Sequence, residues 1–309
     1  MTPVGSSTPG TGWFLNGLAN LQQQEAQTER ELSSGYRVND ASDSPAQTPQ
    51  LIQLGSSLAS VQTYQENLQN VQTEASTADQ AIGSSITLLQ SAINIATEGA
   101  SSTATAASNQ IFADNIQGIQ QQMVALANTT VAGRAIFGGN QDQSAPYRYN
   151  ATSAPTGVDT LTISTANRAI VNPQGDTVYQ SLTAQQIFDP VDATNAPTAS
   201  NTFAALQSLQ TALQSNDQTG IASALTSLQT ASSYLNQQQA YYGAAEQRMT
   251  SEQNIAANQV TTLQTQIGNI RDTNFAQAAT DLATETTDQS AAMGSEAEIS
   301  TKTLFDYLG

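Results

Sequence analysis

The chain has 309 residues, a formal net charge of −17 and only 11% charged residues, against about 25% in ordinary soluble proteins. A surface this acidic cannot displace counterions from nucleic acid and disfavours an anionic membrane, so neither is an expected partner. Because the chain has no Cys and no His, disulfides, thiolate nucleophiles, Ser-His-Asp triads and the usual zinc sites are excluded, and we expect no cofactor.

Gln, Ser, Thr, Asn and Ala take the place of the missing charges. Such a surface can be buried at low cost, because it forms hydrogen bonds without stranding charge. The composition therefore favours a subunit that is packed on many sides over an isolated, weakly charged helical protein.

The N-terminal segment, residues 1–12, is rich in Gly, Pro, Ser and Thr and is predicted to be disordered. It lacks the basic and apolar segments of a signal peptide. No apolar run approaches the ~18 residues of a membrane span. A first helix is predicted over residues 13–33, with Gly35 as its C-terminal cap.

A long heptad stripe follows between residues 51 and 96. Apolar residues recur there mostly at alternating steps of three and four, which is the period of a left-handed coiled coil. The stripe consists of Leu51, Leu54, Leu58, Val61, Tyr64, Leu68, Val71, Ala75, Ala78, Ile82, Ile86, Leu89, Ile93 and Ala96. Residues 49–99 are therefore predicted to form one long helix, whose stripe needs partner helices.

A turn over residues 100–108 and a third helix, which ends before Gly133, complete a predicted antiparallel hairpin. The chain then changes character. Between residues 135 and 200, short β-branched runs at 160–163, 169–171 and 177–179 alternate with turn residues, which predicts a small β-rich insert.

Helical periodicity returns at Phe203 and continues, after a turn near Gly220, to Ile270, with a weaker pattern over residues 274–308. The predicted fold class is mainly α: a long antiparallel helical bundle or coiled coil built from both termini, with a small β-rich insert. The expected domains are a disordered extension (1–12), an N-terminal helical part (13–134), the insert (135–200) and a C-terminal helical part (201–309).

Fourteen apolar residues are expected to pack in this bundle or between subunits. They are Leu15, Leu18, Leu32, Leu54, Val61, Leu68, Ile82, Leu89, Val260, Leu263, Ile267, Ile270, Leu304 and Leu308. Gly35, Arg37, Gly133 and Arg134 are expected at turns between elements. Each of these arginines is expected to pair with a carboxylate or to cap the C-terminus of a helix, and a surface pair and a subunit contact both stay open.

Some carboxylates invite a catalytic or metal-binding interpretation. They are Asp40 and Asp43 at a turn, Asp281, Glu285 and Asp288 about one helical turn apart, and the segment 189–192. Acid–base catalysis needs a pocket and a shifted pKa, which nothing in the sequence indicates, and residues 189–192 lack the Gly and Glu of an EF-hand loop. We expect capping and solvent-facing roles, with no catalytic residue and no metal.

Three segments resemble the bacterial flagellin superfamily. Residues Ser33–Ala46 are similar to its SSG turn and the Asp-rich start of the helix that follows. Residues Gly133–Gly139 resemble the GRYLFSG segment of one of its families, the hook–filament junction family (hook-associated protein 3), and Leu304–Leu308 resemble that family's LLDYL ending. The similarity extends over nearly the whole chain in order and spacing.

The resemblance implies a non-enzymatic structural subunit of the bacterial flagellum that joins hook to filament by coiled-coil self-assembly. It implies a secreted, extracellular protein that is exported without a cleaved signal peptide. Its implied partners are further copies, another hook-associated protein and flagellin, and the resemblance allows an export chaperone. Filament flagellin is the main alternative, because size, lack of Cys and both end motifs fit it as well. A surface adhesin or a coiled-coil signalling module, which would be a stable helical monomer, is the alternative from a different class.

Overall fold

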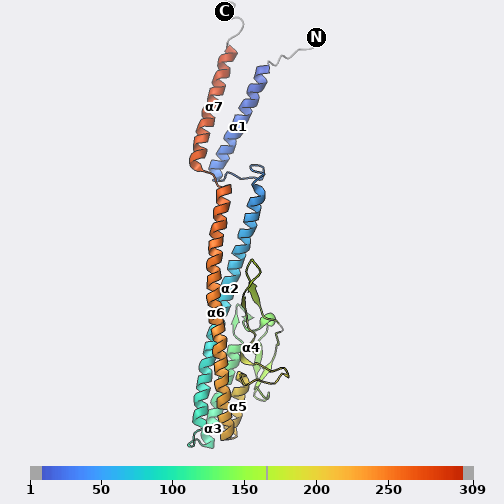
Figure 1. The fold of residues 1–309 in the computed structure, drawn as a ribbon, viewed down its shortest axis with the longest axis vertical. Helices are drawn as coiled ribbons and strands as arrows, with labels where there is room; N and C mark the ends of the chain where they lie inside the picture. The colour runs from blue at the N-terminus through green and yellow to red at the C-terminus, as the bar shows by residue number, and fades with distance from the viewer. Residues whose placement is uncertain (1–8, 165, 302–309) are drawn as a thin grey trace, which may run out of the picture. The chain divides into compact units, whose positions relative to one another are not determined.

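The computed structural model describes residues 9–164 and 166–301 (Figure 1). The chain divides into two compact units. The end unit consists of residues 1–60 and 259–309, and the middle unit consists of residues 61–258. Among the described residues, no helix combines the length and the hydropathy needed to cross a bilayer.

Seven helices account for most of the described chain. They are α1 (Pro9–Ser34), α2 (Thr48–Gly99), α3 (Ala106–Ala127), α4 (Ala184–Phe188), α5 (Thr202–Gln214), α6 (Gln218–Arg271) and α7 (Phe275–Thr301). The strands are β1 (Thr130–Val131), β2 (Arg134–Ala135), β3 (Tyr147–Tyr149), β4 (Val158–Thr160), β5 (Ala169–Val171) and β6 (Thr177–Gln180), and a 3-10 turn covers Gly139–Gln141. The mainly helical fold class predicted from the sequence is confirmed.

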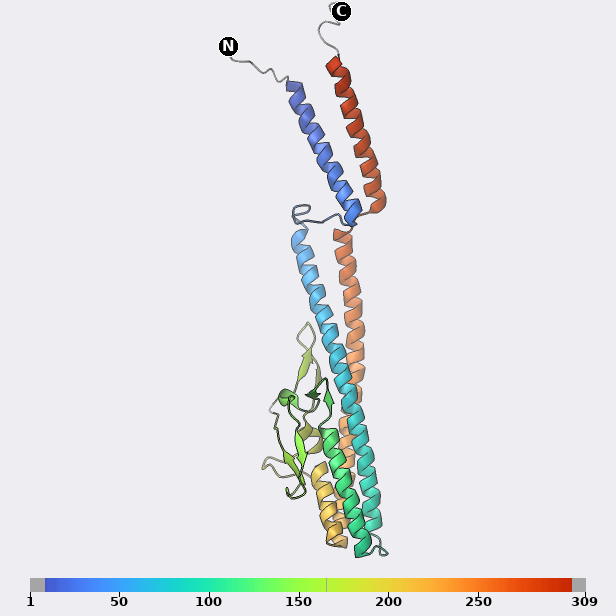
Figure 2. The same ribbon diagram turned by 180° about the vertical axis from the view of Figure 1, so that it is seen from behind.

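The middle unit is built on the antiparallel packing of α2 against α6, with α3 and α5 alongside (Figures 1 and 2). Two side-chain hydrogen bonds fix the register: Tyr64 Oη donates to Glu252 Oε2 at 3.1 Å, and Gln90 Nε2 donates to Ser232 Oγ at 3.2 Å. As residue numbers rise along α2 they fall along α6, so the two helices run antiparallel to each other over many turns.

The buried face of α2 follows the predicted stripe only in part. Its buried residues are Val61, Tyr64, Leu68, Ala75, Ala78, Ala81, Ile82, Ser85, Leu89, Ala92, Ala96 and Gly99. Beyond Ile82, Ser85 and Ala92 occupy the buried positions that the sequence pattern assigns to Ile86 and Ile93, which are half-buried. The heptad steps continue, but they pass through smaller residues.

Two predicted boundaries are wrong. Residues 106–108, predicted as part of a turn, begin α3, because Thr105 and Ser108 form a reciprocal capping box that satisfies two amides of the first turn. Residues 9–12, predicted to be disordered, belong to α1 (Pro9–Ser34). Residues 1–8 lie outside the described residues.

Three two-stranded antiparallel sheets follow α3. The β1–β2 pair lies at the predicted start of the insert, over residues 130–135, and β3–β4 and β5–β6 lie within the insert. The strand predicted at 160–163 is displaced: β4 ends at Thr160 and pairs with β3, while residues 161–164 are in no strand. An aromatic core joins the insert to α5, with Tyr147 5.0 Å and Phe188 6.3 Å from Phe203 between ring centroids. Phe137 packs edge-on against Phe188 at 5.5 Å.

Asp189 is a buried carboxylate beside this core. It accepts hydrogen bonds from Asn201 Nδ2 at 2.5 Å and from Tyr147 Oη at 3.4 Å. Burial raises the pKa of Asp189 above its ordinary value, and the two hydrogen bonds oppose the rise only in part. Asp192, on the exposed loop that follows, shows the opposite: bonds from Thr194 and from the Ala196 amide lower its pKa.

These opposite shifts predict opposite pH dependences. The pKa of Asp189 is higher in the folded protein than in the unfolded chain, where an Asp has a pKa of ~3.9. Such a carboxyl stabilises the folded protein below pH ~3.9, and this stabilisation is lost as the pH rises through the folded pKa. From pH 4 to pH 7, the Tm of Asp189→Asn should therefore improve relative to the unsubstituted protein, because the unsubstituted protein must ionise Asp189. Asp192→Asn should show the opposite trend at lower pH. Its Tm should fall relative to that of the unsubstituted protein as pH rises from about 2 to about 5, because the lowered pKa of Asp192 adds stability as this carboxyl ionises. The same direction of pH dependence for both variants would contradict the assignment.

Candidate assembly surfaces

The α1–α7 pair of the end unit leaves much apolar surface uncovered. The two helices lie side by side in both views (Figures 1 and 2), and Thr28 Oγ1 donates to Glu285 Oε1 at 3.2 Å between them. Among residues 12–34 no side chain is buried. Trp13 is 82% exposed, Leu15 62% and Phe275 57%. Two helices that bury so little gain little from each other, so this pair presents an open face.

The fourteen predicted packing residues fall into distinct groups. Val61, Leu68, Ile82 and Leu89 of the middle unit and Leu263 of the end unit are buried. Leu18, Leu32, Leu54, Val260, Ile267 and Ile270, all in the end unit, are half-buried, and Leu15 is exposed. Leu304 and Leu308 lie outside the described residues. Apart from Leu263, the described predicted residues of the end unit therefore retain accessible apolar surface.

A backbone joint ties the α1–α2 turn to the α6–α7 turn within the end unit. We name residues 35–38 and 270–275 the turn joint. The amides of Arg37 and Val38 both donate to the Arg271 carbonyl, at 2.7 and 3.2 Å, and the Thr273 amide donates to the Gly35 carbonyl at 3.0 Å. Arg37 Nη2 donates to the Ile270 carbonyl at 2.6 Å, which is the helix-capping role open to it from the sequence.

Side chains close the same joint. The Arg271 guanidinium lies 4.0 Å from the centre of the Tyr36 ring, a cation–π arrangement. Gly35 has φ +75 and faces the Phe275 ring, and its amide donates to the Glu31 carbonyl at 2.9 Å. This left-handed residue ends α1.

Arg134 lies at a tight turn of the insert. Residues Ala132 and Gly133 have φ +51 and +79, as a two-residue hairpin turn between β1 and β2 requires. Arg134 Nη2 pairs with Asp142 Oδ2 at 2.7 Å, which is the carboxylate partner expected for it. Burial acts to raise the pKa of Asp142, but the bonds from Gln143 and Arg134 outweigh it and hold this pKa below its ordinary value.

Arg168 anchors the insert to α2, and sequence reasoning did not single it out. Its Nη2 and Nη1 donate to the two carboxylate oxygens of Glu74 at 2.8 and 3.3 Å, a bidentate geometry. Nη1 also lies 3.6 Å from Asp142 Oδ2. Ninety-four residues separate Arg168 from Glu74, so no local pattern could have revealed the pair.

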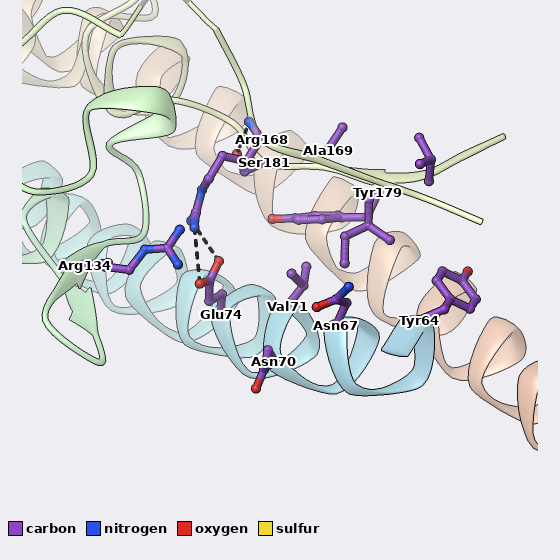
Figure 3. Close-up of a pocket in the computed structure, with 12 residues that line it drawn as sticks. Tyr64, Asn67, Asn70, Val71, Glu74, Arg134, Arg168, Ala169, Tyr179 and Ser181 are labelled. Carbon is purple, nitrogen blue, oxygen red and sulfur yellow. Dashed lines mark hydrogen bonds and ion pairs between the residues drawn. The ribbon is translucent and has the colours of Figure 1, made fainter. Parts of the chain in front are cut away.

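We name the β5–β6 hairpin the insert arm. An open crevice of about 420 Å³, the arm crevice, lies between this hairpin and α2 (Figure 3). Asn67, Val71 and Glu74 lie on the side of α2 that faces the arm, and Tyr179 and Arg168 reach toward them. The ion pair marks one end of this arm crevice. The walls combine amides, aliphatic groups and internally paired charges.

Several of the carboxylates considered as catalytic or metal-binding groups have structural partners. Asp43 accepts the amides of Asn39 and Asp40 at 2.9 and 2.8 Å, and these bonds lower its pKa. Asp192 closes its own loop through Thr194 and Ala196. Within the described ranges, no group of three or more His, Cys, Asp or Glu side chains is placed to hold a metal ion.

Two family models match most of the chain and agree with this architecture. The bacterial flagellin N-terminal helical region matches residues 14–142, and the bacterial flagellin C-terminal helical region matches residues 225–308. The first match contains α2, α3 and the turn joint's N-terminal half, and the second contains most of α6 and all of α7. The chain belongs to the bacterial flagellin superfamily.

Within the superfamily, the chain is similar to flagellar hook-associated protein 3. It is 30% identical to that protein of Escherichia coli over 209 residues, and 24% identical to that of Salmonella typhimurium over 179 residues. These alignments cover 65% and 57% of this chain and span 63% and 56% of the two relatives.

Solved structures share the fold. A flagellar hook-associated protein of Vibrio parahaemolyticus has a TM-score of 0.63 at 17% identity, covering 74% of this chain and 100% of its own. FlgL of Bacillus cereus has a TM-score of 0.55 at 16% identity, covering 70% and 99%. At these identities the likeness establishes the fold alone.

The turn joint predicts opposite effects of two glycine substitutions in the end unit. Gly35→Ala should destabilise the joint by roughly 1–2 kcal/mol, because an L-residue is strained at this φ, although its Cβ would meet Phe275 only at an ordinary 3.6 Å. The matched control, Gly55→Ala inside α2, should stabilise by about 0.5–1 kcal/mol, since its Cβ would meet no atom within 4 Å. Hydrogen exchange of the Gly35 and Thr273 amides measures both, and equal protection in both variants would contradict the joint.

Proposed function

We propose that this protein is a structural, non-enzymatic subunit of the bacterial flagellum that joins hook to filament by coiled-coil self-assembly. The observation that carries the proposal is the open apolar face of the α1–α7 pair, where Trp13, Leu15 and Phe275 are each more than half exposed. A chain that exposes such residues on helices at both of its ends needs neighbours to cover them. The name of its relatives, flagellar hook-associated protein 3, supports the same role.

The mechanism follows from incomplete burial. The end helices gain little from their own pair, so they are only marginally ordered in a free monomer and complete their folding when neighbouring subunits cover the open face. The uncharged polar surface of the middle unit can be buried between subunits without stranding charge. Its neighbours are further copies, another hook-associated protein and flagellin.

The proposal extends to export and domain organisation. The protein is secreted as an unfolded chain without a cleaved signal peptide, with an export chaperone as a further partner, and functions outside the cell. Residues 13–134 and 201–309 form the helical bundle from both ends, and residues 135–200 form the insert. Filament flagellin remains the second candidate function, because the two family models describe flagellin's own helical regions.

Deletion of the gene separates the two candidate functions. Loss of a junction subunit should leave cells that release unpolymerised flagellin into the medium, because filament cannot attach to hook. Loss of the filament subunit should instead remove the main secreted protein. Immunoblotting the medium and electron microscopy of the remaining hooks provide the readouts, and a mutant with normal filaments would contradict both candidates.

Leu15 offers a test of the open face itself. Leu15→Ser should leave the free energy of unfolding of the monomer within about 0.5 kcal/mol, because the side chain is 62% exposed, yet it should lower incorporation into flagella several-fold. The neighbouring exposed residue provides the control: Asn16→Ser should change neither quantity. Quantitative immunoblots of purified flagella provide the measure, and normal incorporation of Leu15→Ser would count against assembly through this face.

A further inference from the structure

A segment with strand-forming sequence lacks a strand partner. Leu161-Thr162-Ile163 alternates apolar and polar residues and contains the β-branched Thr162 and Ile163, yet it lies outside every strand of the described chain. The Leu161 amide donates to the Pro146 carbonyl at 2.8 Å, but the Ile163 amide has no hydrogen-bond partner among the described residues. Leu161 is 49% exposed and Ile163 is 64% exposed. Thr162 is half-buried, and its Oγ1 donates to the Ala145 carbonyl at 3.2 Å. The segment is therefore uncharged and tethered to residues 145–146, and it exposes two large apolar side chains to solvent.

The arm crevice exposes apolar side chains and an amide that such a segment could cover. Val71 and Ile170 are half-buried and Val171 is 53% exposed along its walls. The Asn67 amide lies on the same side of α2 (Figure 3) and forms no hydrogen bond with any described residue. A side-chain amide can both donate to and accept from a peptide backbone. The volume of about 420 Å³ falls in the ~300–1,000 Å³ range of ligand sites.

The charges of the crevice restrict its occupant. Arg168 and Arg134 are already paired with Glu74 and Asp142, so a charged occupant would gain no partner and would lose its hydration. A segment that enters must be uncharged and must place apolar side chains on alternate positions, the pattern by which a groove recognises an extended peptide. Leu161-Thr162-Ile163 meets both requirements.

We propose that residues Leu161–Ile163 of one copy bind in the arm crevice of a second copy, with Leu161 and Ile163 facing Val71, Ile170 and Val171. This proposal rests on the proposed function, which brings copies of the chain side by side. The contact joins two different surfaces, so it is heterologous, and each copy retains one free segment and one free crevice. Repetition of such a contact builds a ring or a helical assembly.

The absence of Cys from the chain permits a direct test in flagella. Cells co-express two single-cysteine variants, Val71→Cys and Ile163→Cys, and their isolated flagella are treated with a mild oxidant. A disulfide requires Cα atoms about 4.4–6.8 Å apart, so it should form between the two variants in assembled flagella and be absent after each variant is expressed alone. The matched control replaces Ile163→Cys with Thr152→Cys, an exposed insert residue outside both surfaces, and should give several-fold less disulfide dimer.

The outcomes separate this proposal from the function on which it rests. Flagella that contain both variants without the disulfide dimer overturn the docking proposal and leave the proposed function intact. A double variant, Val71→Cys with Ile163→Cys in one chain, that gives only an intrachain disulfide overturns it as well, because the segment then binds its own crevice. Absence of either variant from purified flagella, with the unsubstituted chain also absent, overturns the proposed function itself.

Discussion

The antiparallel packing of α2 on α6 is the contact on which the middle unit depends. Its seam is rich in alanine: Ala75, Ala78, Ala92 and Ala96 on α2 are buried, and so are Ala224, Ala231, Ala245 and Ala256 on α6. Small residues let two helices approach closely but contribute little apolar area, at about 25 cal/mol per Å². The seam therefore needs cover from larger side chains, which α3 and α5 supply with Ile116, Met123, Phe203 and Leu206. In the end unit the described residues include no such cover, which is why the same kind of stripe stays half-buried there.

Scarce positive charge is concentrated where distant segments meet. The chain has seven Arg and one Lys. Arg37 and Arg271 close the turn joint, and Arg134 and Arg168 fix the insert against Asp142 and Glu74. Arg37, Arg168 and Arg271 each bind a carbonyl, a carboxylate or a ring that is far away in the sequence. Arg134 differs, because Asp142 lies only eight residues further along the chain.

The periodicity of apolar residues predicted the long helices and the buried face of α2. It could not predict contacts between residues that are distant in the sequence. The three-and-four pattern identified α2 because a long helix repeats its signal over many turns. It misassigned Ile86 and Ile93 because hydropathy favours the largest apolar residue, while close helix packing selected Ser85 and Ala92 beside them. The start of α3 was missed because the capping signal at Thr105 consists of two hydroxyl residues without the usual Glu or Gln. The Arg168–Glu74 ion pair joins residues that are far apart in the chain, so no local sequence pattern indicates it.

The misplaced strand at 160–163 is a failure of a different kind. The exposed Leu15, which was predicted to pack in the bundle or between subunits, has a related cause. In each, the local sequence specifies an extended or a packed state, and the single chain supplies no partner to satisfy it. Agreement between local preference and global fold is what allows a sequence to specify one structure, and the sites where it breaks down tend to be functional. A subunit is selected for its assembled state, so preferences that conflict with the monomer can agree with the assembly. On that argument, the residues whose sequence-based prediction fails in one chain are the first places to look for contacts between chains.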